Sequence, residues 1–251
     1  MNTVRIADLL EPFLEQPLSS SQIDQISIYI DLLKRWNARI NLTAIRNEEE
    51  IVTRHFGESF FLARHLSIPC HPERSHAMRK AHDVAESKDP YSPTTAGAPL
   101  IAQVAMSGPQ PPSVLDIGSG AGFPGLPLKI YAPTIHLTLI ESNHKKAAFL
   151  REVARALTLT SVNVIAARAE TLSTRVGQDF PPADIVTLRA VEQFETILRQ
   201  AVTFMAPQAS LALLIGTAQI PHLSTLTTLK WCPPIPVPQS HTRVLSIGIR
   251  E

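Results

Sequence analysis

The stretch SVLDIGSGAGFPG, residues 113–125, decides the fold class of this 251-residue chain. A short apolar run leads into three glycines at alternate positions, Gly118, Gly120 and Gly122. A glycine-rich turn between a strand and a helix lets a ligand approach the backbone, because no side chains stand in the way. We therefore expect a nucleotide-type site at the carboxyl end of the first strand of an α/β fold.

The spacing of the glycines distinguishes two classes of cofactor. A dinucleotide fingerprint needs a glycine three positions after Gly120, where this chain has Phe123. The pattern therefore favours S-adenosylmethionine and disfavours a nicotinamide-dependent oxidoreductase. Glu141 closes the second predicted strand, where a carboxylate can accept hydrogen bonds from both ribose hydroxyls of a nucleoside. Ala169 and Glu170 follow the third strand, on the side where the adenine ring is expected.

Short apolar runs alternate with helical stretches along the rest of residues 113–251. The predicted strands are SVLDIG, HLTLIES, VNVIAA, DIVTLR, SLALLIG and RVLSIGIR, and helices are expected to begin near Pro124, His144 and Gln193. Such alternation predicts a parallel sheet covered by helices. A proline-rich stretch separates the last two strands.

The chain before the first strand divides into two parts. Residues 1–66 predict a helical segment, because apolar residues recur at three- and four-residue intervals from Ser19 to Ile40 and Asn47 can cap a second helix that ends near Leu66. Residues 67–112 contain eight prolines and lack apolar periodicity, so we interpret them as a flexible insertion. The remainder of the chain forms the domain that contains the sheet.

Composition and charge limit the classes of protein. With 44% apolar residues the chain can bury a full core, and its formal net charge of +1 excludes a strongly basic, histone-like binder. The two cysteines, Cys70 and Cys232, make no disulfide framework, so we expect a reducing, cytoplasmic compartment. Acidic residues interrupt the apolar ones in residues 1–18, and we expect neither a signal peptide nor a membrane span there. Cys70 and the nearby histidines match no common zinc spacing, and we expect no metal site.

Residues around the fourth strand indicate the type of methyl acceptor. Adenine-N6 enzymes carry an acidic or amide residue and then Pro-Pro-aromatic after this strand, whereas residues 187–191 read TLRAV. Cytosine-C5 enzymes need a nucleophilic cysteine, and Cys232 lies too far along the chain. Arg189 follows the strand at the edge where ligands bind in open α/β sheets. Its planar donors suit an RNA phosphate or a guanine edge, so we predict that Arg189 is an active-site residue.

Three motifs in order give a more specific indication than any single loop. They are RWNARINLTAIRNEEEIVTRHFGES at residues 35–59, VLDIGSGAGFPGLPLKI at residues 114–130, and AARAETL followed by VTLRAV. Together they resemble the bacterial small-subunit ribosomal RNA guanine-N7 methyltransferase family known as RsmG or GidB. The resemblance implies a helical N-terminal segment beside a Rossmann-like, S-adenosylmethionine-dependent methyltransferase sheet. It also implies methylation of N7 of one guanosine in the 530 loop of 16S rRNA, as free RNA or in a small-subunit particle.

The resemblance extends to individual positions. It implies that Gly118 and Phe123 contact the cofactor and that Asn41 and the pair Arg54 and His55 belong to the helical signature. Three features depart from the family pattern: Glu58 replaces a usual aspartate, Ile215 replaces a usual lysine, and a proline-rich insertion precedes the first strand. The complete set of candidate cofactor residues is Asp116, Gly118, Gly120, Gly122, Phe123, Glu141, Ala169, Glu170 and Arg189, and Arg189 is also the catalytic candidate.

The chemistry of guanine N7 fits the residue types present. N7 has an in-plane lone pair and no proton, so its methylation needs alignment of two reactants and no general base. Alternative functions are a small-molecule methyltransferase and a non-catalytic protein that binds RNA or the ribosome. We expect no membrane and no obligate protein partner. Candidates for contacts to the RNA backbone are Arg35, Arg39, Arg46, Arg54, Lys145 and Lys146.

Overall fold

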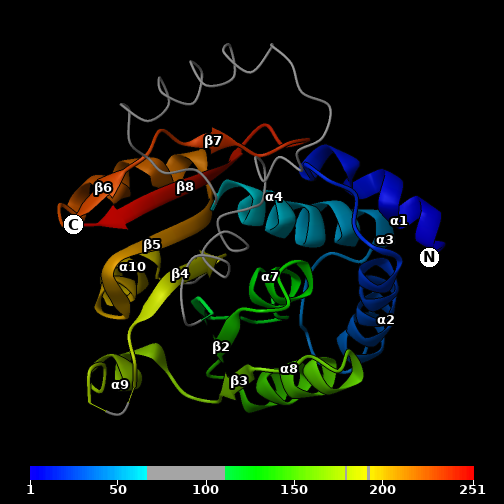
Figure 1. The fold of residues 1–251 in the computed structure, drawn as a ribbon, viewed down its shortest axis with the longest axis horizontal. Coiled ribbons are helices and arrows are strands. Elements are labelled where there is room, and N and C mark those ends of the chain that lie inside the picture. The colour runs from blue at the N-terminus through cyan, green and yellow to red at the C-terminus, as the bar shows by residue number, and fades with distance from the viewer. Residues whose placement is uncertain (67–110, 179, 191–192) are drawn as a thin grey trace, which may run out of the picture.

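The computed structural model describes residues 1–66, 111–178, 180–190 and 193–251 (Figure 1). The predicted insertion therefore lies outside the described residues, apart from its last two positions. Cys70 and the histidines that follow it, for which we expected no metal site, lie outside them as well.

The described strands form one mixed sheet of eight strands. The order is β3-β2-β1-β4-β5-β8-β6, and β7 pairs with β8. The first five strands are parallel, as predicted, while β8 is antiparallel to β5 and closes that end of the sheet. Strands β6 and β7 lie in and beside the proline-rich stretch, where none was predicted. The strands are β1 (Ser113–Ile117), β2 (His136–Ile140), β3 (Val162–Ile165), β4 (Ala183–Arg189), β5 (Met205–Gly216), β6 (Leu229–Trp231), β7 (Ile235–Pro236) and β8 (Arg243–Arg250).

The N-terminal segment is helical, and its caps are the predicted ones. Ser19 accepts a hydrogen bond from the backbone of Gln22, whose side chain returns one to the backbone of Ser19. Asn47 accepts from two backbone N–H groups of the next helix, which continues through a π-helical stretch to His65. The elements are α1 (Thr3–Leu10), η1 (Glu11–Phe13), α2 (Ser20–Asn37), α3 (Glu48–Glu50), η2 (Ile51–Gly57) and α4 (Glu58–His65).

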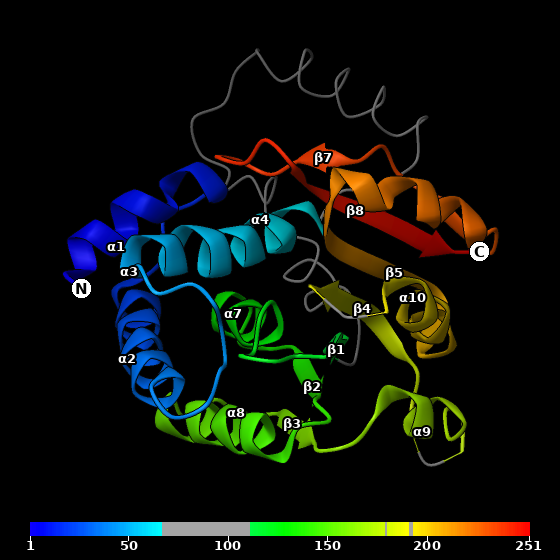
Figure 2. The ribbon, with the colours of Figure 1, turned by 180° about the vertical axis from the view of Figure 1, so that it is seen from behind.

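Helices cover both faces of the sheet (Figures 1 and 2). The N-terminal helices share one apolar core with α7 (Gly125–Tyr131), α8 (His144–Ala156) and one face of the sheet. The other face packs against α9 (Ala169–Ser173), α10 (Phe194–Thr203) and η3 (Thr217–Thr225). The N-terminal segment is therefore part of the same packed body as the sheet, which brings its residues next to the strand ends.

Two further observations concern Cys232 and the length of the helices. Cys232 is disulfide-bonded in the structure. Among the described residues, no helix is long and apolar enough to cross a membrane.

Candidate active site

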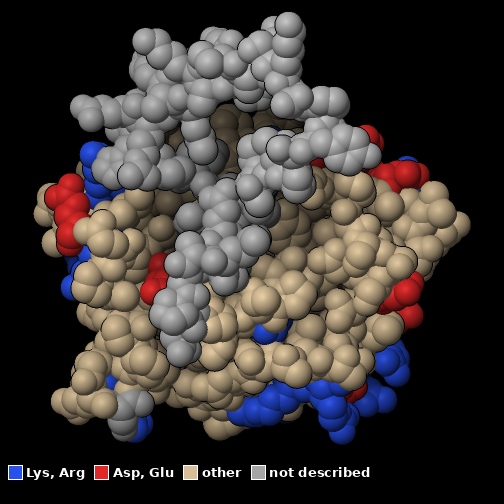
Figure 3. Space-filling view, viewed as in Figure 1, with Lys and Arg blue, Asp and Glu red and all other residues tan. Residues whose placement is uncertain are grey.

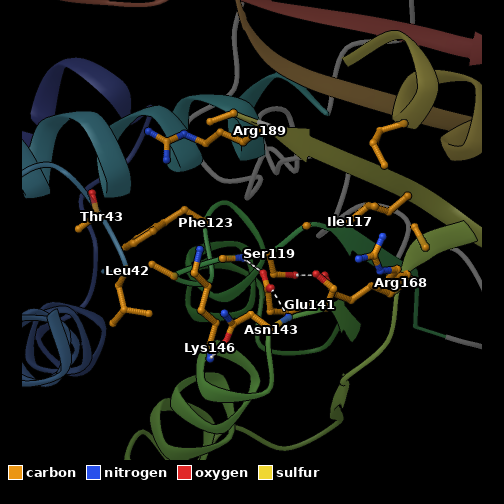
Figure 4. Close-up of a pocket in the computed structure, with 18 of the residues that line it drawn as sticks. Leu42, Thr43, Ile117, Ser119, Phe123, Glu141, Asn143, Lys146, Arg168 and Arg189 are labelled. Carbon is orange, nitrogen blue, oxygen red and sulfur yellow. Dashed lines mark hydrogen bonds between the residues drawn. The ribbon is translucent and has the colours of Figure 1, made fainter. Parts of the chain in front are cut away.

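A pocket of about 660 Å³ opens at the carboxyl ends of the first four strands. It lies where β1 has β2 on one side and β4 on the other, the crevice at which open α/β sheets bind ligands. Loops after the strands form one wall, and the N-terminal segment forms the other (Figure 4). The loop wall includes Gly118, Ser119, Gly120, Glu141, Asn143, Ala169 and Glu170, and the N-terminal wall includes Leu42, Thr43, Ala44 and His55.

The glycine-rich turn has the conformation that the sequence predicts. Gly118, Gly120 and Gly122 have φ angles of +68°, +56° and +89°, which favour glycine. A side chain at Gly120 would meet only the Gly118 carbonyl oxygen, 3.8 Å away, so this position opens onto the pocket. A Cβ at Gly122 would lie 2.4 Å from Tyr29 Oη. The third glycine therefore permits α2 to pack against the turn and does not line the pocket.

Glu141 is held beneath the turn by backbone donors. Its Oε2 accepts from the N–H of Gly120 at 2.8 Å, and its Oε1 accepts from the N–H of Asn143 at 2.7 Å. The side chain is buried, yet it lines the pocket, and each carboxylate oxygen has a second lone pair. The carboxylate can therefore accept hydrogen bonds from a ligand without losing the two that orient it.

Asp116 has a different place from the one expected of a cofactor ligand. Its Oδ1 accepts from Thr187 Oγ1 at 2.8 Å and its Oδ2 from the N–H of Gly125 at 3.3 Å. Burial raises the pKa of the Asp116 carboxyl to about 6, against the hydrogen bonds that lower it. The side chain is fully buried and does not line the pocket. It joins β1 to β4 and to the start of α7.

The side-chain amide of Asn37 holds the loop at Leu42 and Thr43 in place. Asn37 Oδ1 accepts from the N–H groups of Leu42 and Thr43 at 2.8 and 3.0 Å, and Asn37 Nδ2 donates to the carbonyl oxygen of Thr43 at 3.0 Å. The three hydrogen bonds fix the loop that carries Leu42, Thr43 and Ala44 to the pocket. A side-chain amide has the two donors and the acceptor that this needs.

Arg189 leaves the end of β4 and points towards the N-terminal helices (Figure 4). Its Nη2 lies 3.1 Å from Glu58 Oε2 and donates to the carbonyl oxygen of Arg54 at 2.8 Å. Its Nη1 lies 2.9 Å from His55 Nδ1. Burial lowers the pKa of Arg189, and the Glu58 carboxylate opposes this shift. Glu58 Oε1 also lies 2.8 Å from Arg243 Nε, so one buried carboxylate forms ion pairs with two guanidinium groups.

Comparison with known proteins identifies the family. The model of rRNA small subunit methyltransferase G, GidB, matches residues 22–69 and 100–229. This chain belongs to the GidB family. A relative named ribosomal RNA small subunit methyltransferase G from Roseiflexus castenholzii is 38% identical over 200 residues, covering 77% of this chain and 68% of the relative. One with the same name from Roseiflexus sp. is 40% identical over 180 residues, covering 72% of this chain but only 59% of the relative.

Solved structures match this chain at lower sequence identity than these relatives do. A SAM-dependent methyltransferase from Aquifex aeolicus superposes with a TM-score of 0.46 at 14% identity, covering 57% of this chain and 84% of that chain. The GidB assignment rests on the family match and the relatives, and the fold class rests on the strand order and the N-terminal helices described above.

The GidB pocket collects most of the predicted residues. Seven of the nine candidates line it: Gly118, Gly120, Phe123, Glu141, Ala169, Glu170 and Arg189. The other two, Asp116 and Gly122, lie behind the turn, as described above. The sequence pattern placed all nine near the strand ends and could not separate those that face the pocket from those that support it.

Two features of the N-terminal wall were not predicted as site residues. His55 stacks on Phe123, with ring centroids 4.5 Å apart, and its Nδ1 lies 2.9 Å from Arg189 Nη1. Thr43 lines the pocket and lies 2.8 Å from His55 Nε2. The motif RHFGES was recognised in the sequence, but the contact of His55 with Arg189, 134 positions away, depends on the tertiary fold.

Ile215, which replaces a usual lysine of the family, is buried in β5 and does not line the pocket. Its neighbour Gly216 is paired with Arg243 across the sheet. Arg243 is a cation on the adjacent strand, and its guanidinium contacts Glu58. Its contact with Glu58 also ties β8 to the N-terminal helices.

Proposed function

We propose that this protein transfers a methyl group from S-adenosylmethionine to N7 of a guanosine in 16S rRNA, within the 530 loop, in the cytoplasm. The observation that supports this most strongly is the pocket itself, which joins the glycine-rich turn to a wall built from the family's N-terminal motif. Residues of all three motifs that carry the family resemblance thus meet at one place.

The loop wall fits an adenosyl cofactor. Gly120 leaves space above the backbone, Gly118 lines the same pocket, and the Glu141 carboxylate keeps lone pairs for ribose hydroxyls. Ala169 and Glu170 border the far end, where the adenine ring belongs in this arrangement. When bound, S-adenosylmethionine supplies an electrophilic methyl group. The protein residues hold the two reactants in line and exclude water, which suits a nucleophile that carries no proton.

The described pocket also offers no free imidazole as a base. His55 is the histidine in its wall, and both ring nitrogens lie within hydrogen-bond distance of Arg189 or Thr43. Burial lowers the pKa of His55 to about 2, so the ring is neutral at physiological pH. Guanine N7 needs no deprotonation, and a site with its imidazole occupied in this way supports that choice of acceptor atom.

A basic surface beside the pocket supports RNA as the substrate. Figure 3 shows Lys and Arg side chains gathered along the lower edge, over α8 and the adjoining end of α2. Lys146 reaches the pocket wall from this surface. The surface comprises Arg35, Lys145, Lys146, Arg151 and Arg155, none of which forms an ion pair with a described acidic residue. Unpaired cations beside a pocket suit phosphate contacts.

Methyl transfer to RNA is the direct test. Purified protein is incubated with labelled S-adenosylmethionine and small subunits from cells that lack the gene, and mass mapping locates the label. We expect one methylated guanosine in the 530 loop and loss of cofactor binding, measured by calorimetry, in Gly118→Val and Glu141→Ala. Cofactor binding without transfer to RNA would instead support a small-molecule methyltransferase. Binding of small subunits without transfer would support a non-catalytic role.

A further inference from the structure

The hydroxyl group of Thr43 occupies an unusual position in the pocket wall. Its Oγ1 accepts a hydrogen bond from the N–H of Ile45 at 3.1 Å and lies 2.8 Å from His55 Nε2. Thr43 lines the same pocket as the glycine-rich turn. What this hydroxyl can offer a ligand depends on which group donates in its contact with His55.

Arg189 determines the tautomer of His55. A guanidinium has only donors, so the contact of 2.9 Å between Arg189 Nη1 and His55 Nδ1 requires Nδ1 to be the acceptor. A ring whose Nδ1 carries a lone pair is neutral, and its one proton is on Nε2. His55 Nε2 therefore donates to Thr43 Oγ1. The low pKa of His55, caused first by burial and then by Arg189, agrees with this geometry.

The state of Thr43 follows from that of His55. A hydroxyl has two lone pairs and one proton. The N–H groups of Ile45 and His55 occupy both lone pairs, and the Thr43 hydroxyl donates to no described residue. The hydroxyl proton of Thr43 is therefore available to donate a hydrogen bond to a ligand, because Thr43 lines the pocket.

Glu58 orients the guanidinium of Arg189, which in turn contacts His55. Four of the five N–H groups of Arg189 have partners: Nε and one on Nη2 face Glu58, the other on Nη2 faces the Arg54 carbonyl, and one on Nη1 faces His55. Most of the hydrogen-bond donors of the Arg189 guanidinium therefore already have partners within the protein. This geometry favours a positioning role for Arg189 over the bidentate contact with RNA that the sequence suggested.

We propose that Thr43 is a specificity-determining residue whose hydroxyl donates a hydrogen bond to O6 of the target guanine, oriented by Glu58, Arg189 and His55. The inference rests on the proposed function. The edge of guanine that carries N7 presents two acceptors, N7 and O6. N7 is the reacting atom, so O6 is the acceptor available to the hydroxyl. Adenine presents an amino donor at the same place, which faces a group that can only donate. The contact therefore selects guanine.

The test combines protein variants with changed bases. Small-subunit RNA is joined from fragments so that the target position carries either guanosine or 2-aminopurine, which keeps N7 and lacks O6. The variants are Thr43→Val, which removes the hydroxyl, and Thr43→Ser, which keeps it. Thr53→Val is the matched control, since its hydroxyl donates to the Glu49 carbonyl on the same helical run and does not line the pocket. Single-turnover methyl transfer and competition binding are measured for each pair.

We expect Thr43→Val to lose roughly tenfold in kcat/KM on guanosine RNA, the equivalent of one hydrogen bond, and less than about twofold on 2-aminopurine RNA. Thr43→Ser and Thr53→Val should stay close to the wild type on both. Equal losses by Thr43→Val on the two RNAs, or no loss on guanosine RNA, would overturn the role of Thr43 while leaving the proposed function intact. A wild-type protein that methylates neither RNA, though it binds S-adenosylmethionine, contradicts the proposed function, and this inference with it.

Discussion

The two walls of the pocket are built in different ways. The loop wall uses backbone: the turn from Gly118 to Phe123 is one continuous stretch, and Glu141 is held by N–H groups of that turn and of Asn143. The N-terminal wall, which runs from Leu42 to His55, is supported by side chains that come from separate elements. Arg189 of β4, Arg243 of β8 and Glu58 of α4 meet in one buried cluster.

The difference predicts how each wall responds to mutation. A wall made of backbone depends on local conformation, so it should fail when a glycine acquires a side chain. The stability of a wall that is supported by buried charged side chains depends on each of them, because a charge left unpaired in the interior is costly. The loop wall should therefore be sensitive at single glycines, and the N-terminal wall should be sensitive at the carboxylate that its cations share.

The largest expected effect is that of Glu58→Ala. Glu58 is 2% exposed, and its removal leaves the guanidinium of Arg189 buried without its anion. Breaking a buried pair in this way costs about 3–5 kcal/mol of unfolding free energy. Urea unfolding measures the change. Glu49→Ala is the matched control, because its pair with Arg5 is about half exposed and should contribute nothing measurable. Similar curves for the two variants would show that the cluster is not a structural requirement.

The second effect concerns the loop wall, in Gly122→Ala. The new Cβ would lie 2.4 Å from Tyr29 Oη and 2.6 Å from Leu126 Cδ1, at a φ of +89°. Overpacking and the positive φ together should cost about 3 kcal/mol. Gly177→Ala separates the two causes, since Gly177 has a φ of +83° and nothing within 4 Å of a Cβ. If both variants lose the same unfolding free energy in urea, the close contact between α2 and the turn does not contribute to the cost of Gly122→Ala.

The same contrast explains which parts the sequence predicted. Contiguous patterns determine six of the eight strands, the caps at Ser19 and Asn47, and the glycine-rich turn, and these were predicted. The contact of Glu58 with Arg189 joins positions 131 apart, so it depends on how helices pack against the sheet. Strands β6 and β7 were not predicted because they flank prolines, which are tolerated at a sheet edge but disfavour a strand assignment.

The third prediction is a dependence on pH that sharpens the difference between the walls. Burial lowers the pKa of His55 to about 2, whereas an exposed histidine in the unfolded chain titrates near 6.5. Below pH 6.5 the unfolded chain binds the extra proton, so the stability that neutral His55 contributes is complete above this pH and declines as the pH falls. The decline approaches about 1.4 kcal/mol per pH unit.

The variant His55→Asn isolates this contribution. The pKa of Asp116 is raised to about 6, so Asp116 has the opposite sign and favours the folded state as the pH falls from 6, but it is present in both proteins. Urea unfolding from pH 7.5 to 5.0 should therefore show the wild type and His55→Asn converging in stability on the acid side. A constant difference across this range would mean that His55 is not held neutral by the N-terminal wall.

The smallest effect on stability is expected for a deletion in the segment that connects the N-terminal helices to the first strand. The family model matches residues on both sides of 70–99 and none between them. Because the N-terminal helices share a core with the sheet, packing and not the connecting chain should hold the walls together. Deletion of residues 71–99 retains Cys70 and should change the unfolding free energy by about 1 kcal/mol or less, since loop closure depends only weakly on length. Cofactor affinity by calorimetry should stay the same. A truncated protein that loses cooperative unfolding or cofactor binding would assign the insertion a structural role in the pocket.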